Sequence, residues 1–108
     1  MDDSDNNQPE KSTATVSVPA DHPALEGHFP GDPVVPGVMI LELVSQLVES
    51  SYPQAKLRRI PHAKFIAPLK PGQHMCIETT RNGSVVRFCC RHGADIISNG
   101  DMVFSFEE

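Results

Sequence analysis

The chain has 108 residues, 39% of them hydrophobic and 21% charged, and its formal net charge at pH 7 is -5. This length fits one domain, and a core this small gains from burial between subunits, so we expect a dimer or a larger oligomer. No segment is long enough to span a membrane, and the N-terminus lacks the apolar stretch of a secretory signal. With six aromatic residues, no Trp and no recognisable binding motif, the chain is not expected to bind nucleic acid.

The cysteines indicate a reducing compartment. There are three, Cys76, Cys89 and Cys90, and two of them are adjacent, which is not the pattern of a disulfide framework. No CxxC pair or shared His spacing points to a metal site. We therefore predict a cytoplasmic protein with no metal and no cofactor.

The charges are distributed unevenly along the sequence. Residues 56–91 hold eight bases and one acid, Glu78, a net charge of +7 within a chain that is acidic as a whole. Such a stretch is either a set of solvated strand faces and turns or a docking surface for an acidic partner.

The first elements in chain order are a tail, a strand and a long loop. Residues 1–13 are polar and mostly acidic, so they are predicted to be a disordered tail preceding a single domain over residues 14–108. Residues 14–19 alternate small apolar and polar side chains, which favours a strand. The loop over residues 20–36 is rich in proline and contains Gly27 and Gly31. A long loop stiffened in this way is more often functional than idle.

A helix is predicted to begin near Gly37 or Val38 and to end around Ser50 or Ser51, because Pro53 cannot continue it. The stretch VMILELV over residues 38–44 is apolar on every side, which predicts a helix buried all round. Glu42 is its one charged residue. A carboxyl group in such a helix is costly unless it is paired, hydrated or functional.

The remainder of the chain reads as strands. Residues 56–65 are predicted to be extended and broken at Pro61, residues 67–73 to turn, and residues 75–80, 84–92 and 101–106 to form three further strands. The Asn82-Gly83 and Asn99-Gly100 pairs are strong hairpin signals. One buried helix with a meandering antiparallel sheet gives an α+β fold in which the sheet wraps the helix, the hot-dog arrangement.

The candidate chemistry lies between the loop and the helix. His28 is a loop histidine of a type that can act as a base near neutral pH. Gly37 at the helix start lets a ligand approach unpaired backbone amides at the positive end of the helix dipole. Glu42 is either a buried structural acid, hydrogen-bonded to the backbone or to Gln46 four residues later, or the acid of the site, which Gln46 then orients. These groups suit proton abstraction next to a thioester carbonyl, followed by elimination or hydration at the β carbon.

The segment GHFPGDPVVPGVMILELVSQ, residues 27–46, resembles the active-site signature of the 3-hydroxyacyl-[acyl-carrier-protein] dehydratases, the FabZ/FabA family. A second segment, Ala63-Lys64-Phe65 through Pro71-Gly72, resembles the family's strand and turn that follow the helix. The residues that match the signature are Gly27, His28, Phe29, Pro30, Gly31, Pro33, Pro36, Gly37, Val38, Glu42 and Gln46.

The resemblance implies a dimer with composite active sites, in which His28 of one subunit acts with Glu42 of its neighbour. His28 would act on the α proton, Glu42 would help the β-hydroxyl to leave as water, and the Gly37 amide would bind the thioester carbonyl. The implied substrate is a 3-hydroxyacyl group on acyl carrier protein, an acidic partner. The further predicted substrate-binding residues are Phe29, Pro36, Val38 and Gln46, and the predicted carrier-docking residues are Arg58, Arg59, Lys64 and Lys70.

The chain also departs from that family. Glutamate at position 42 resembles the FabZ branch, so isomerase activity is not predicted. The N-terminal segment of FabZ is absent, and the chain is more similar to the short dehydratase-like proteins of aryl polyene and related pigment clusters. Such subunits pair with themselves or with a different hot-dog partner. Two other functions stay open: a hot-dog thioesterase, and a non-catalytic carrier-binding subunit of a synthase complex.

Overall fold

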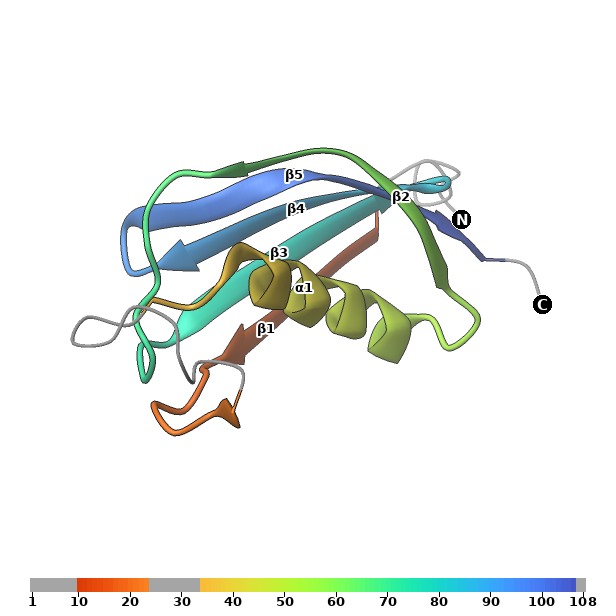
Figure 1. Cartoon of the computed structure of the whole chain (residues 1–108). Helices are drawn as coiled ribbons and strands as arrows, with labels where there is room; N and C mark the ends of the chain where they lie inside the picture. Colours follow the sequence, from red (N-terminus) through yellow and green to blue (C-terminus); the bar gives the residue numbers. More distant parts are fainter. Residues whose placement is uncertain (1–9, 24–33, 107–108) are drawn as a thin grey trace, which may run out of the picture.

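The computed structural model describes residues 10–23 and 34–106, which form an antiparallel sheet with a helix against one face (Figure 1). Hydrogen-bonded neighbours across the sheet follow the order β1-β3-β4-β5-β2, so β1 and β2 are the two edges. The bounds of the described elements are β1 Glu10–Val16, α1 Gly37–Ser51, β2 Lys56–Phe65, β3 Met75–Asn82, β4 Val85–His92 and β5 Asp95–Ser105. The prediction of an α+β fold is therefore confirmed.

The core lies between α1 and the inner face of the sheet. In β3, Met75 and Ile77 are buried while Glu78 is exposed, the alternation expected of a strand with one solvated face. Phe88 and Phe104 are the largest fully buried side chains and come from the neighbouring strands β4 and β5. Burial of these aromatic side chains fixes which face of the sheet meets the helix.

Two prolines set the ends of α1. Pro36 has φ -59 and ψ 145, and its carbonyl accepts the first helical hydrogen bonds, from Met39 and Ile40. Tyr52 leaves the helix with an extended backbone, φ -135 and ψ 92, because the residue before a proline, here Pro53, avoids the helical region. The predicted bounds of the helix are confirmed.

The prediction of a helix buried on every side is wrong for the described chain. Ile40, Val44, Ser45 and Val48 are buried, but Glu42 lies on an exposed face, and Val38 on that face is 63% exposed. Exposed Val38, Glu42, Gln46 and Glu49 recur every three or four residues, the period of one helix face. The apolar composition of residues 38–44 does not indicate an exposed face, because Val38 is itself apolar and the residues between Val38 and Glu42 lie on other faces of the helix.

The first strand begins earlier than predicted. It starts at Glu10 rather than Ala14, so residues 10–13 belong to the sheet, and the predicted tail of residues 1–13 is too long. Lys11 pairs with Thr80 and Ser12 with Thr79 of β3. Pairing with a central strand outweighs the polar composition of this segment. Residues 1–9 lie outside the described residues.

The predicted hairpin at Asn99-Gly100 is wrong, because β5 runs through both residues. A Cβ on Gly100 would contact the His62 carbonyl oxygen and would lie 2.8 Å from the Ala63 Cα. The glycine therefore permits close approach of β2, a role that glycine has in strands as well as in turns. The turn before β5 instead contains Gly93, with φ 60.

The remaining strands lie close to their predicted ranges, except that β5 begins at Asp95 rather than at residue 101 and β2 runs through Pro61 without the predicted break. β2 has the predicted bounds, and its pairing with β5 shifts register on both sides of Arg59, the second shift spanning Pro61. The hairpin at Asn82-Gly83 joins β3 to β4, with Gly83 at φ 65, a backbone conformation that favours glycine.

Candidate functional site

Unpaired backbone donors lie at the start of α1. The first helical hydrogen bonds come from Met39 and Ile40, 3.0 and 3.3 Å from the Pro36 carbonyl oxygen. The N–H groups of Gly37 and Val38 precede these bonds and have no acceptor within the helix. Among the residues that the structure describes, no side chain caps this end. Two donors at the positive end of the helix dipole suit a carbonyl oxygen that gains negative charge.

Gly37 lies directly beneath an aromatic ring. A Cβ at this position would come within 2.8 Å of Phe65 Cζ and 2.9 Å of Phe65 Cε1. Such contacts are closer than van der Waals packing allows. The absence of a side chain at Gly37 therefore lets the end of β2 pack against the helix start.

An open hollow of about 510 Å³ adjoins this contact. It is lined by residues 34–35, Gly37, Ile40 and residues 65–69. Phe65 and Ile66 are 52% and 57% exposed. An apolar hollow beside unpaired amides can hold an acyl chain while its carbonyl meets the helix start.

Phe65 and Ile66 were not among the predicted site residues. The sequence does contain a signal for them. Two large apolar side chains stand between Lys64 and Pro68, in a segment whose other residues are basic or turn-forming, and such a pair indicates a binding surface.

Glu42 does not line the hollow. Its side chain lies on the exposed face of α1, one helical turn after Val38 and one turn before Gln46. Within the described residues, no hydrogen bond or ion pair joins Glu42 to Gln46 or to any other group. Of the predicted residues that the structure describes, Gly37 lines the hollow, whereas Pro36 does not, and Val38, Glu42 and Gln46 lie on an open helix face.

Two of the predicted residues, His28 and Phe29, lie outside the described residues. The described residue nearest to them on the helix side is Val34, which lines the hollow. Their predicted roles, as base and as substrate contact, stay predictions.

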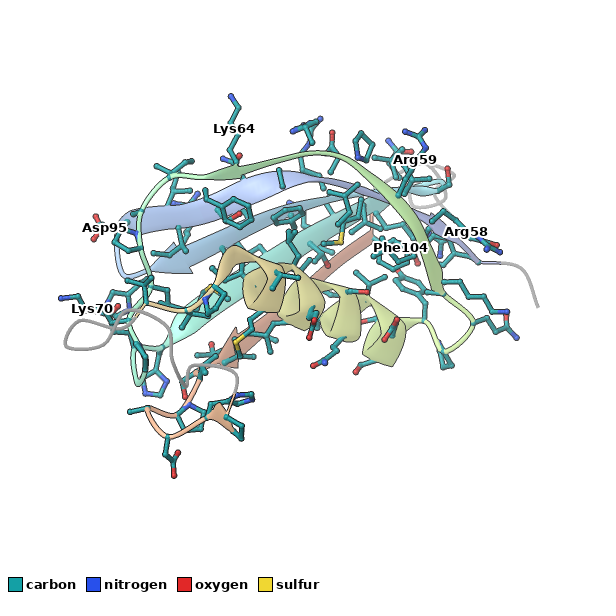
Figure 2. All side chains as sticks on the ribbon, viewed as in Figure 1. Arg58, Arg59, Lys64, Lys70, Asp95 and Phe104 are labelled. Carbon is teal, nitrogen blue, oxygen red and sulfur yellow. The ribbon has the colours of Figure 1, made fainter. Side chains whose placement is uncertain are left out.

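The predicted carrier-docking residues are all exposed, but they do not form a compact patch. Figure 2 shows Arg58 and Lys70 toward opposite ends of the molecule, with Arg59 and Lys64 between them along β2. Lys64 precedes Phe65 and Lys70 follows Leu69, so these two lysines flank the segment that lines the hollow.

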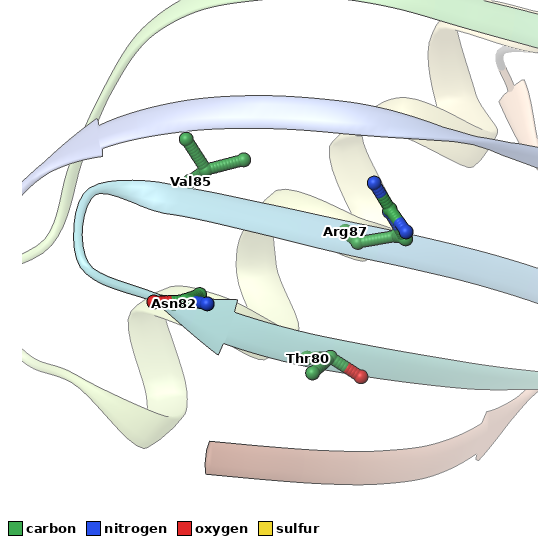
Figure 3. A pocket seen from close by; sticks show the side chains of 4 residues that line it. All are labelled: Thr80, Asn82, Val85 and Arg87. Carbon is green, nitrogen blue, oxygen red and sulfur yellow. The ribbon is translucent and has the colours of Figure 1, made fainter. Parts of the chain in front are cut away.

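A second hollow, of about 360 Å³, lies on β3 and β4 (Figure 3). Its lining side chains are Thr80, Asn82, Val85 and Arg87, none of which was a predicted site residue. Arg87 donates to Asp101 Oδ1 at 3.3 Å, and no other charged side chain lines the hollow. It offers no pair of groups for acid–base chemistry.

The family model described as ApeI dehydratase matches residues 4–101. The chain therefore belongs to the ApeI-like family. This match spans the described helix, the hollow and the strands β1 to β4. No helix among the described residues has the length and apolar character needed to cross a membrane.

Curated relatives are similar to the chain over part of their length. The 3-hydroxyacyl-[acyl-carrier-protein] dehydratase FabZ of Myxococcus xanthus is 37% identical over 79 residues, covering 64% of this chain and 52% of the relative. FabZ of Levilactobacillus brevis is 30% identical over 111 residues, covering 91% and 75%. The chain spans about half the length of the first of these relatives.

Solved structures confirm the hot-dog fold. The dehydratase heterocomplex ApeI:P from Xenorhabdus doucetiae superposes with a TM-score of 0.80 at 20% identity, over 91% of this chain and 88% of that chain. A mutant of the fluoroacetyl-CoA-specific thioesterase FlK superposes with a TM-score of 0.69 at 16% identity, over 92% and 94%. At these identities the likeness concerns the fold.

Proposed function

We propose that the protein is a 3-hydroxyacyl-[acyl-carrier-protein] dehydratase that removes water from a 3-hydroxyacyl thioester to give a trans-2-enoyl thioester. The observation that carries the proposal is the family match over residues 4–101, which includes the HFPG loop and Glu42. The helix start adds two unpaired amides beside an apolar hollow. The predicted compartment is the cytoplasm, and the predicted pathway is fatty acid, aryl polyene or related biosynthesis.

Three groups take part in the elimination: the side chains of His28 and Glu42 and the backbone amide of Gly37. His28 takes the α proton, and the electron pair of that C–H bond moves into the α carbon and the thioester carbonyl. The Gly37 amide stabilises the oxygen that becomes negative. The electron pair of the enolate then forms the double bond between the α and β carbons as the C–O bond at the β carbon breaks, and Glu42 gives its proton to the departing hydroxide, which leaves as water. The apolar hollow holds the acyl chain near Phe65.

The exposure of Glu42 supports a site completed by a second subunit. A general acid works best in a partly desolvated site, where its interactions with substrate are strong. Within one described chain the face of Val38, Glu42 and Gln46 is open instead. We therefore propose that a second hot-dog subunit covers this face and brings its own HFPG loop to Glu42.

The acyl carrier protein is the proposed acidic partner of Arg58, Arg59, Lys64 and Lys70. Lys64 and Lys70 flank the segment that lines the hollow, so a carrier held there would deliver its acyl group over a short distance. Arg58 and Arg59 lie further along β2 and would contribute mainly through their field (Figure 2).

The test is a mass-spectrometric assay on acyl carrier protein that bears 3-hydroxyacyl groups of several chain lengths and an aryl example. The wild-type protein should remove one water from at least one of them. Glu42→Gln should lower turnover by about 10²–10⁴-fold, because a general acid is lost. Its stability should stay within about 0.5 kcal/mol of wild type, because the side chain is exposed. Glu49→Gln is the matched control, since Glu49 is an exposed carboxylate on the same helix face.

Other outcomes would overturn the proposal. Normal turnover by Glu42→Gln would contradict the assigned role, and His28→Ala with full activity would contradict the base. Release of free acid would move the assignment to a thioesterase. No change with any acyl group, even with the natural partner subunit added, would favour a non-catalytic subunit.

A further inference from the structure

A serine lies on the buried face of β5. Ser98 is fully buried and shares this face with Met102 and Phe104 of the core. A buried hydroxyl group is costly unless it finds a hydrogen-bond partner. Here the Ser98 hydroxyl donates to the backbone carbonyl oxygen of Lys64 on β2, with 2.7 Å between the two oxygen atoms. The serine therefore ties β5 to the end of β2, directly before the residues that line the hollow beside Gly37.

The pairing of β2 with β5 places Phe65 next to this serine. Phe65 and Ser98 are direct partners in the antiparallel pair, and side chains of direct partners lie on the same face of the sheet, about 5 Å apart at Cβ. The Phe65 ring is therefore directed to the face that α1 covers, where it packs on Gly37. The Lys64 side chain points away from the helix (Figure 2), so only its backbone carbonyl takes part in the contact with Ser98.

Backbone hydrogen bonds hold the rest of the segment that lines the hollow. The N–H groups of residues 66 and 67 donate to the Ile97 carbonyl oxygen at 2.8 and 3.3 Å, and the Val35 N–H donates to the Leu69 carbonyl oxygen at 2.8 Å. These bonds join main-chain groups, so they do not depend on which side chains are present. The anchor at Ser98 is a side chain, so a single substitution there removes one attachment and leaves these bonds in place.

We propose that Ser98 is a positioning residue of the dehydration site, which holds the Phe65 ring as the wall between the helix start and the hollow. It acts through the Lys64 carbonyl and does not itself touch the substrate. The inference rests on the proposed function, because the wall matters only when the thioester carbonyl lies at the Gly37 amide and the acyl chain lies in the hollow.

The kinetic effect should depend on the length of the acyl group. Loss of the hydroxyl loosens the wall, so an acyl chain that lies against Phe65 loses contacts in the ground state and the transition state alike. Such a loss raises KM and leaves kcat nearly unchanged. A short acyl group has little surface to lay against the ring and should lose little. General destabilisation would instead lower the amount of active protein, and with it kcat for every substrate.

The kinetic experiment compares Ser98→Ala with wild type in the assembly that is active in the dehydration assay. The substrates are 3-hydroxybutyryl carrier protein and the longest acyl group that wild type accepts. For the long group, KM should rise by about three- to tenfold, the range expected for the loss of one hydrogen bond. For the short group, KM should change by less than about twofold, and kcat should stay within about twofold for both.

The position of the ring is measured without substrate. The ring current of Phe65 displaces the backbone resonances of Gly37 in a proton–nitrogen correlation spectrum, and Phe65→Leu, which has no ring, supplies the reference. In Ser98→Ala, the Gly37 resonances should move toward that reference. Unchanged resonances would overturn the inference, whatever the kinetics show.

Two sets of control variants separate the hydroxyl from its surroundings. Ser98→Thr and Ser98→Val have nearly the same shape, but only threonine keeps the hydroxyl, so Ser98→Thr should lie nearer to wild type in both measurements. Thr79→Val removes another buried hydroxyl, which donates to the Ser12 carbonyl oxygen on β1, at the opposite edge of the sheet. It should leave the Gly37 resonances and the dependence on acyl length at their wild-type values.

Equal behaviour of Ser98→Thr and Ser98→Val would overturn the inference, because the hydroxyl would then be irrelevant. So would an equal fall in kcat for both acyl groups with KM unchanged, which is the mark of a structural role alone. A shifted Gly37 resonance in Ser98→Ala, without dehydration of any tested substrate by wild type, would contradict the proposed function and support the positioning of the ring. An active wild type whose KM does not depend on Ser98 at any acyl length would do the reverse.

Discussion

The effect of adding a Cβ at a tightly packed glycine depends on which atoms that Cβ would meet, as Gly37 and Gly100 show. A Cβ on Gly37 meets the far end of the Phe65 ring, which is half exposed and can turn aside. A Cβ on Gly100 meets the backbone of β2, which cannot move without disturbing the sheet. The same substitution therefore has different consequences at the two positions.

We predict that Gly100→Ala lowers the free energy of unfolding by about 3 kcal/mol through overpacking. Gly37→Ala should change it by less than about 1 kcal/mol, because alanine's better helix propensity offsets the displaced ring. Gly37→Ala should nevertheless lower dehydration, since its methyl group and the moved ring crowd the amides. Urea unfolding of both variants, with turnover, checks this. Equal loss of stability at both positions would contradict the argument.

The thiol of Cys90 makes the free energy of unfolding depend on pH in the alkaline range. Burial, with Cys89 and Cys76 close by, raises the pKa of its thiol from 9.0 to about 12. Between these values the unfolded chain loses the proton while the folded chain keeps it. The free energy of unfolding should therefore fall as pH rises from about 9 toward about 12, by up to ~1.4 kcal/mol per unit.

The measurement is urea unfolding at several pH values in that range. Cys90→Ala should be less stable than wild type at neutral pH, because it leaves a void, but its stability should fall less steeply with pH. Tyr52, whose pKa is also raised by burial, is unchanged in the variant, so the difference in slope belongs to Cys90. Parallel pH profiles would contradict the prediction.

At the scale of elements, the side chain of Arg81 on β3 makes contacts that connect β1 and β3 with the ends of α1 and β5. Its guanidinium lies 3.6 Å from the Phe106 ring centroid and 4.7 Å from that of Tyr52, and its Nη1 lies 3.5 Å from Glu10 Oε1. These contacts tie β1 and β3 to the end of α1 and to the residue after β5. Planar stacking of this kind needs the guanidinium of arginine.

We predict that Arg81→Ala costs about 1–2 kcal/mol and that Arg81→Lys recovers less than half of it, because lysine keeps the charge and loses the stacking. Thermal and urea unfolding measure both. A double-mutant cycle with Phe106→Leu should show coupling of about 1 kcal/mol. Additive effects would mean that the contact between Arg81 and Phe106 does not contribute to stability.

The sequence predicted elements wherever local and tertiary preferences agree. The helix ends at prolines, and the Asn82-Gly83 turn has a positive φ, so local rules suffice there. At Asn99-Gly100 the same dipeptide lies inside a strand, because the glycine serves contact with β2, a segment far away in sequence. Local patterns cannot distinguish these two uses of glycine.

The candidate site was predicted by its residue types but not by its geometry. Gly37 lies at the start of the helix, as the sequence predicted, and its role in binding substrate stays a prediction. Glu42 was expected to be buried and is exposed, because the apolar residues around it in the sequence lie on other faces of α1. Phe65 was missed for a different reason: its contact with Gly37 joins segments that are distant along the chain.

At the scale of the whole molecule, α1 exposes negative charge and β2 carries positive charge. The exposed charged residues of α1 are Glu42 and Glu49, and β2 carries four bases and no acid. The proposed acidic carrier would therefore be repelled by the helix face and attracted to β2 and the turn after it. We predict that this attraction guides the carrier to the side on which the hollow opens, since residues 65–69 lie between Lys64 and Lys70.

We predict that Lys64→Glu/Lys70→Glu raises KM for a carrier-bound 3-hydroxyacyl group by about tenfold or more and lowers kcat much less, because the lost attraction acts mainly on encounter and docking. The same acyl group on a small neutral thioester should show a much smaller rise, since it has no acidic surface to be held. Salt should weaken carrier use by wild type more than by the variant. Lys11→Glu, on the opposite edge of the sheet, is the control for net charge. Equal rises in KM for the two substrates would mean that the lysines act on the hollow itself, and an unchanged KM for the carrier would place docking elsewhere.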